Sequence, residues 1–175
     1  MCVLQETVPL TSHPATDPLQ ERLLPAAPHT LALLEAGTTF LLANCGDGAA
    51  VQALARRYPR SLFAGIDDSA WSIRQAREAA RAARLTNVWF ESGDITTQGF
   101  DGLFHVVAYL GKEPEERPVL SVIEGLYTSL RRQGTLLWHP AAWNASLRLF
   151  EAGFASVQRV TFADDPARPL LVARR

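Results

Sequence analysis

The sequence predicts an α/β protein with a doubly wound, mostly parallel seven-stranded sheet, helices on both faces and an antiparallel hairpin at the C-terminus. Three observations predict this fold class. Short runs of apolar residues alternate with segments in which apolar residues recur every three or four positions. A turn with two glycines joins the first such run to a helix. The last two strand-like runs have no helix between them, so they predict a hairpin.

Composition limits the class of protein further. A chain of 175 residues predicts one domain, residues 1–175, with a sizeable core. It has 17 Lys and Arg against 18 Asp and Glu, so we expect no nucleic-acid partner, and an arginine stripe on one predicted helix is interpreted as a solvated face. Cys2 and Cys45 give neither a disulfide framework nor a metal-ligand spacing, so no metal is expected. We find no signal peptide and no apolar run that would span a bilayer, and therefore expect a cytoplasmic protein without a membrane partner.

The first 36 residues are expected to form an arm and two short helices. Residues 1–16 are rich in Pro, Ser and Thr and predict a loose arm or lid. Asp17 followed by Pro18 is a typical helix start, and further prolines divide the region. We therefore predict helices at about 18–24 and 28–36.

From there, strands and helices alternate. A stripe of apolar residues at helical spacing follows Ala49, and Pro59 ends that helix. Ser69 is a suitable N-cap for the next one. The remaining predicted helices span about 70–84, 115–132 and 141–152. We predict strands at about 39–44, 62–66, 87–91, 101–108, 135–138, 154–162 and 170–174.

Ligands of open α/β sheets bind beyond the carboxyl ends of the strands, so the residues after each strand are the candidates for a site. Residues 40–48, FLLANCGDG, predict a strand end, a tight turn and a helix start. Glycine allows the backbone to approach a ligand, and a helix N-terminus presents unpaired N–H groups. Two glycines in such a turn can equally serve packing alone.

Two acids follow neighbouring strands. Asp67 stands at the end of the second strand, where a carboxylate can accept both hydroxyls of a ribose. It can also be an acid favoured by the next helix N-terminus, a role that Asp68 fills equally well. Asp94 can accept a hydrogen bond from an adenine amine, or can bond its own backbone in a turn.

An ordered set of segments from about Thr38 to the C-terminus resembles the class I S-adenosylmethionine-dependent methyltransferases. These segments are LLANCGDG (41–48), FAGIDDSAWSIRQAR (63–77), LTNVWFESGDI (85–95), FDGLFHVVAYL (100–110), LRRQGTLLW (130–138), EAGF and the final PLLVARR. NAD-type Rossmann domains lack the closing hairpin, and Val51 stands where a dinucleotide fingerprint has its third glycine. A dehydrogenase is therefore rejected.

The resemblance implies S-adenosylmethionine as cofactor and a role for several residues. The backbone from Gly46 to Gly48 would hold the methionine and ribose parts, and Asn44 of the same loop is a further cofactor-binding candidate. Asp67 would bind the ribose, Asp94 and the Ile95 N–H would contact the adenine, and Asp68 stands where the family has an apolar residue against that ring. His105 would lie near the methionyl group. The sequence departs from the family at Leu42, where an acid is usual, and at Asn44, where glycine is usual; Asn44 tolerates a positive φ.

Methyl transfer is an in-line displacement, for which the protein mainly has to orient nucleophile and methyl group. A general base is needed only if the nucleophile must lose a proton, and the candidates are His105, Tyr109 and His139. Either histidine can instead be a satisfied structural residue.

We expect methyl transfer to a small-molecule acceptor, because a nucleic-acid motif of the Asn/Asp-Pro-Pro-Tyr type is absent after the fourth strand. So short a domain can complete its acceptor pocket with a second copy, which makes a homodimer a further expectation. The alternative is a catalytically inactive methyltransferase-like binding or scaffolding subunit, motivated by Leu42, Asn44 and Asp68. A non-methylating reaction such as a cyclisation is a third reading.

Overall fold

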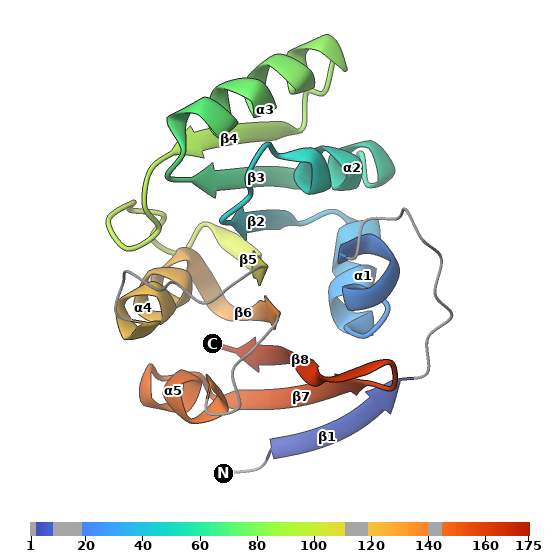
Figure 1. The fold of residues 1–175 in the computed structure, drawn as a ribbon, viewed down its shortest axis with the longest axis vertical. Helices are drawn as coiled ribbons and strands as arrows, with labels where there is room; N and C mark the ends of the chain where they lie inside the picture. The colour runs from blue at the N-terminus through green and yellow to red at the C-terminus, as the bar shows by residue number, and fades with distance from the viewer. Residues whose placement is uncertain (1–2, 9–18, 111–118, 140–144) are drawn as a thin grey trace.

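The computed structural model of the protein describes residues 3–8, 19–110, 119–139 and 145–175, and contains one eight-stranded sheet (Figure 1). The strand order is β1-β7-β8-β6-β5-β2-β3-β4. The strands are β1 Val3–Val8, β2 Thr39–Ala43, β3 Leu62–Asp67, β4 Val88–Ser92, β5 Phe104–Leu110, β6 Leu130–His139, β7 Ser156–Phe162 and β8 Asp165–Arg174. The helices are the π-helical turn η1 Leu19–Leu23, α1 Pro28–Ala36, α2 Ala49–Arg57, α3 Ala70–Ala82, α4 Val119–Ser129 and α5 Ala145–Glu151.

The pairing of the strands confirms the predicted fold class. Strands β2 to β6 pair in parallel, whereas β8 runs antiparallel to both of its neighbours, β6 and β7. The closing hairpin is therefore β7–β8. The strand order reverses at β2. Strands β3 and β4 are added on one side of β2, and β5 and β6 are added on its other side. Such a switch point opens a crevice at the carboxyl ends of its strands.

Strand β1 is an eighth strand that the sequence did not predict. Val3–Val8 pairs in parallel with β7, with Val3 opposite Val157, in a segment interpreted above as part of a loose arm. An edge strand offers unpaired N–H and C=O groups, so a segment with weak periodicity can gain its strand hydrogen bonds from the sheet. The possible lid formed by the rest of that arm falls on residues 9–18, outside the described residues.

Helices cover both faces of the sheet, which explains why the predicted strands are apolar without interruption. Figure 1 shows α1 and α2 on one side of the strands and α4 and α5 on the other. Successive residues of a strand point to opposite faces: Leu42 packs under η1, α1, α2 and α3, and its neighbour Leu41 packs under α4 and α5. Among the described helices none is long and apolar enough to cross a bilayer.

Several boundaries differ from the prediction, and β6 and β8 each begin five residues earlier than predicted, at Leu130 and Asp165. Strand β5 begins at Phe104 rather than at 101, and runs to Leu110. Helix α4 ends at Ser129 rather than at 132, because β6 starts at Leu130 and the chain bulges before Thr135 resumes the ladder with β5. Gln133 has a φ of 63° within this bulge. The shift places His105 at the start of its strand.

The glycine turn rests on the ring of Phe90 from β4. A Cβ on Gly48 would lie 2.5 Å from Phe90 Cε1, and a Cβ on Gly65 of β3 would lie 2.7 Å from Phe90 Cδ1 and from Cys45 Sγ. Gly48 also has a φ of 73°. Packing therefore requires glycine at position 48. This is the alternative given above, in which a glycine of the turn serves packing and not ligand approach.

The arginine stripe consists of Arg74, Arg77, Arg81 and Arg84, and Arg77 contacts the outer edge of β4. Arg77 of α3 donates two hydrogen bonds, from Nε at 3.0 Å and from a terminal nitrogen at 2.7 Å, to the Phe90 carbonyl. Its guanidinium also lies 3.7 Å from the Glu91 carboxylate. Arg77 thus satisfies a backbone acceptor of an edge strand.

We predict that Gly48→Ala lowers the free energy of unfolding by about 2–4 kcal/mol, because it adds a left-handed Cβ and a close contact with Phe90. Urea unfolding followed by circular dichroism measures the change. Gly99→Ala is the matched control, since a Cβ there meets no atom within 4 Å, and it should change stability by less than about 0.5 kcal/mol. Equal stability of the two variants would contradict the packing role of Gly48.

Candidate functional site

The candidate site lies at the carboxyl edge of the sheet, at the switch point between β2 and β5. A small cavity of about 30 Å³ opens there. Its described lining residues come from the ends of β2, β3 and β5, from the segment after β4 and from α4: Asn44, Ile66, Asp67, Asp68, Gly93, Ile95, Tyr109 and Val122. The structure thus brings together five of the predicted site residues, Asn44, Asp67, Asp68, Ile95 and Tyr109, and adds Ile66, Gly93 and Val122.

Asp67 holds the glycine turn to the end of β3. Its Oδ2 accepts a hydrogen bond from the Gly46 N–H at 2.8 Å, and its Oδ1 accepts one from the Ser69 N–H at 3.0 Å. The residue is buried, with 8% of its surface exposed. A carboxylate has about four acceptor positions, so two remain for a ligand. Ser69 itself caps α3 through its hydroxyl, as predicted.

The backbone of the turn adopts left-handed conformations at three positions. Asn44 has a φ of 60°, which confirms that it can replace glycine there, and Gly46 has a φ of 56°. A Cβ on Gly46 would meet nothing within 4 Å, so the main chain at this residue faces open space. Gly46 is therefore the position at which a ligand can approach the backbone, whereas Gly48 is packed against Phe90.

Burial also affects the thiol beneath the turn. It raises the pKa of Cys45 to about 12, with a smaller contribution from the charge of Asp67. The thiol is accordingly protonated, and it serves the packing of the turn against Gly65.

Asp94 shapes the segment that follows β4. Its Oδ1 accepts the Thr96 N–H at 2.9 Å, and its backbone carbonyl accepts the Gln98 N–H at 2.8 Å. This is the turn that the second reading of Asp94 describes. Ile95 is buried next to it and lines the cavity, with its carbonyl against Gly125 of α4.

His105 lies at the opposite end of the sheet from the glycine turn, which contradicts its expected position near the methionyl group. It is the second residue of β5, and its Nδ1 lies 3.0 Å from Thr39 Oγ1 at the start of β2. Arg131 approaches its Nε2 at 3.4 Å. The expectation came from the resemblance alone, and His105 lies within the strand both in the predicted range 101–108 and in β5 as observed. Burial, followed by the charge of Arg131, lowers the pKa of His105, and the residue is a satisfied structural histidine.

Tyr109 and His139 lie at the correct edge of the sheet. Tyr109 is buried in β5 next to Ala43 of β2, and its ring packs 5.3 Å from the ring of Trp138. His139 ends β6, and its Nδ1 lies 3.2 Å from the Pro169 carbonyl. This contact requires Nδ1 to carry the proton, so Nε2 is the basic nitrogen of the neutral ring.

Two apolar residues that line the cavity were not predicted. Ile66 lies one position before Asp67 in β3, and Val122 lies in α4, which packs on one face of the sheet. Neither carries a sequence signal of its own, because an apolar residue at helical or strand spacing is equally expected in the core. Their contribution depends on how α4 packs over β5 and β6.

Comparisons with known proteins agree with this geometry. The sequence profile of a family described as a methyltransferase domain matches residues 34–133, which is more than half of the chain. The chain therefore belongs to this methyltransferase-domain family. No curated protein matches the sequence.

Solved structures show the same fold. An S-adenosylmethionine-dependent methyltransferase from Aquifex aeolicus superposes with a TM-score of 0.71 at 18% identity, over 90% of this chain and 93% of that one. The S-adenosylmethionine-dependent methyltransferase SibL gives a TM-score of 0.70 at 18% identity over 90% of this chain, which spans 56% of the length of SibL. The [4+2]-cyclase SpnF gives 0.68 at 18% identity, over 86% of this chain and 82% of that one. The fold is that of the class I methyltransferases.

The family implies S-adenosylmethionine as cofactor, and the donor set at this edge fits an adenosyl group. The Asp67 carboxylate keeps two acceptor positions, and the main chain at Gly46 faces open space. The volume fits less well, because a cavity of about 30 Å³ holds about one water molecule. Side chains at its rim must therefore move before a nucleoside enters.

Burial lowers the pKa of His139, together with the charges of Arg168 and Arg22, while the hydrogen bond to Pro169 and the charge of Asp165 act in the opposite direction. Below the unfolded value of about 6.5 the unfolded chain binds a proton that folded His139 does not, so the free energy of unfolding decreases as the pH is lowered. We predict that His139→Gln reduces the loss of unfolding free energy between pH 7 and pH 5, measured by urea unfolding at each pH. The exposed His29→Gln is measured alongside, and an unchanged slope in His139→Gln contradicts the prediction.

Proposed function

We propose that the protein transfers a methyl group from S-adenosylmethionine to a small-molecule acceptor. The observation that carries the proposal is the hydrogen-bonded pair of the glycine turn and Asp67 at the switch point of a methyltransferase-family fold. When bound, the cofactor supplies a methyl carbon activated by a sulfonium. The residues of this chain have to bind it, orient it and exclude water.

Each site residue has a proposed role in holding the cofactor. Asp67 accepts the two ribose hydroxyls with the acceptor positions that its bonds to Gly46 and Ser69 leave over. The open main chain of residues 44–46 lies beside the methionine part. Ile95 packs against the adenine, and Asp94 fixes the backbone of that segment through its bond to the Thr96 N–H.

His139 and Tyr109 are the proposed groups on the acceptor side. His139 is neutral at pH 7, because burial lowers its pKa, and its Nε2 can take a proton from an acceptor hydroxyl or amine. Tyr109 lines the cavity and provides a rigid aromatic wall. The segments that follow β5 and β6, residues 111–118 and 140–144, lie outside the described residues.

The proposed class of methyl acceptor is argued from the net charge of the chain. The chain has a net charge of −1, which offers no electrostatic attraction for nucleic acid. We accordingly propose a small molecule as acceptor, action in the cytoplasm, and a homodimer as the assembly that can complete the acceptor pocket.

A second candidate function is a binding or scaffolding subunit without catalysis. The observation that favours it is the small volume between Asn44, Asp68 and Tyr109, together with the buried Leu42 at the place of the usual acid. Cofactor binding with turnover excludes this candidate.

Isothermal titration with S-adenosylmethionine tests the proposal directly. We predict saturable binding that Asp67→Ala weakens by about tenfold or more, because it removes a carboxylate that accepts hydrogen bonds. Asp47→Ala is the matched control: Asp47 lies in the same turn, is exposed, and its carboxylate accepts a hydrogen bond from the nearby Ala49 N–H. Circular dichroism verifies the fold of both variants. If folded wild-type protein gives no heat of binding at millimolar S-adenosylmethionine, the proposal is wrong.

Two substitutions at the rim should tighten cofactor binding. Asn44→Gly keeps the left-handed backbone and removes a side chain that lines the cavity, and Asp68→Leu replaces a charge next to the adenine region with an apolar surface. We predict a several-fold lower dissociation constant for each, from the added space in Asn44→Gly and from roughly 0.8 kcal/mol per CH₂ buried against the ring in Asp68→Leu. Glu78→Leu on the exposed face of α3 removes the same charge elsewhere. Equal or weaker binding by both rim variants would show that the side chains do not limit entry.

A further inference from the structure

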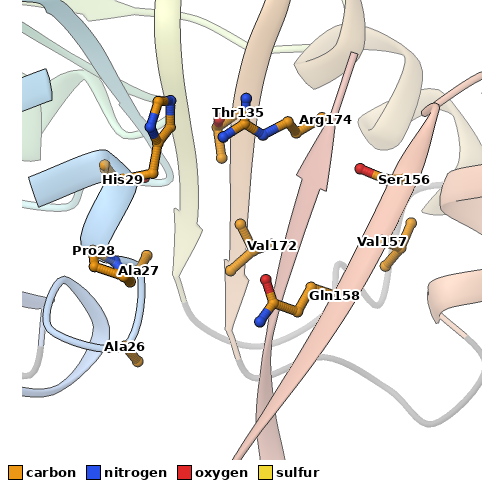
Figure 2. Close-up of a pocket in the computed structure, with 11 residues that line it drawn as sticks. Ala26, Ala27, Pro28, His29, Thr135, Ser156, Val157, Gln158, Val172 and Arg174 are labelled. Carbon is orange, nitrogen blue, oxygen red and sulfur yellow. The ribbon is translucent and has the colours of Figure 1, made fainter. Parts of the chain in front are cut away.

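A second pocket lies on the other half of the sheet, between the first turn of α1 and the strands β6, β8 and β7. Its volume is about 270 Å³, close to the lower end of the range for small-molecule sites, ~300–1,000 Å³. Figure 2 shows α1 on one side of it and the three strands on the other. The lining residues are Ala26, Ala27, Pro28, His29, Thr30, Thr135, Ser156, Val157, Gln158, Val172 and Arg174.

This pocket is separate from the candidate site of the cofactor. Thr135 pairs with Val106 near the start of the parallel strands, and Ser156 is the first residue of β7. The glycine turn and Asp67 follow the opposite, carboxyl ends of those strands. None of the residues assigned to the cofactor or to the acceptor side lines the second pocket.

Two buried hydroxyl groups in its lining lack a partner. Thr30 is 1% exposed and Thr135 is 2% exposed, and neither Oγ1 makes a hydrogen bond within the part of the chain that the structure describes. A buried hydroxyl without a partner costs about 1–3 kcal/mol. The two hydroxyls come from opposite walls, α1 and β6, so a ligand between them can satisfy both.

The charges of the lining have one sign. Arg174 extends from β8 toward Thr135 on β6, as Figure 2 shows, and Arg174 and Thr135 are paired across the ladder. No carboxylate of the described residues forms an ion pair with Arg174, and none of the described lining residues is acidic. Helix α1 begins at Pro28 without a side-chain cap. Residues of its first turn line the pocket, so the positive end of the helix dipole lies at this wall.

Part of the remaining lining is apolar. Ala26, Ala27 and Pro28 form one wall, and Val172 of β8 lies on the strand side. An inorganic anion would leave these surfaces in contact with water, whereas an organic acid covers them with its body. Gln158 and Ser156 offer further hydrogen bonds at the rim.

We propose that this pocket binds a small organic carboxylate, with its carboxylate at Arg174 and the two threonine hydroxyls and its apolar body against Val172 and the start of α1. The guanidinium provides a charge-assisted hydrogen bond, and each hydroxyl donates a hydrogen bond to the anion. The site is independent of the methyltransferase reaction, and its occupation does not require cofactor.

Benzoate and its neutral analogue benzamide are the probes. Titration of the full chain with each, followed by ¹H–¹⁵N chemical shifts, should show saturable shifts at the backbone of Thr135 and Val172 with benzoate below about 10 mM. Benzamide and inorganic phosphate should bind about tenfold more weakly or not at all. Equal binding of benzamide overturns the role of the charge, and equal binding of phosphate overturns the role of the apolar wall.

Substitutions of lining residues test whether benzoate binds in this pocket. Arg174→Gln should weaken benzoate binding about tenfold, whereas Arg132→Gln, at an exposed arginine of β6 outside the lining, should leave it unchanged. Val172→Phe should fill the pocket and abolish binding. If that variant fails to fold, Thr135→Val takes its place.

Thr135→Val has an opposite effect on stability and on binding. It replaces an unpaired buried hydroxyl by a methyl group, so the melting temperature without ligand should rise while benzoate binding weakens. A lower melting temperature with unchanged benzoate affinity overturns the proposal. Titration with S-adenosylmethionine in the same variants should give the wild-type affinity, which separates this result from a failure of the cofactor site.

Discussion

The hydrogen bond from the Gly46 N–H to the Asp67 carboxylate is the contact on which the site depends. It connects the turn after β2 to the end of β3, and Phe90 from β4 packs beneath both strands against Gly48 and Gly65. Three consecutive strands of the sheet thus determine the shape of one turn. The buried carboxylate accepts two backbone N–H bonds, and its other acceptor positions remain open to a ligand.

The parts of the fold that the sequence predicted are those with local signals. The apolar runs of β2 and β3, the proline after α2 and the Ser69 cap each lie within a few residues of the element they define. Asn44 in a left-handed conformation was also predictable, since the turn that surrounds it is local. The parallel order followed from the alternation of strands and helices.

The rest depends on contacts between distant segments. Glycine at position 48 is required by Phe90, which is remote in sequence, so packing and ligand approach could not be distinguished in advance. Strand β1 exists because the edge of β7 supplies its hydrogen bonds. Strand β5 begins at Phe104, so His105 lies at the end of the sheet where Thr39 and Arg131 contact it, and neither partner is near it in sequence.

The bond from Arg77 to the Phe90 carbonyl affects how copies of this chain can meet. A partner that adds a strand to a sheet needs the free carbonyl and N–H groups of an edge. On β4 one of those carbonyls is already occupied by a guanidinium from α3, and the side chain that supplies it covers the approach. Intermolecular extension of the sheet is therefore directed to the opposite margin, where β1 is the outermost strand.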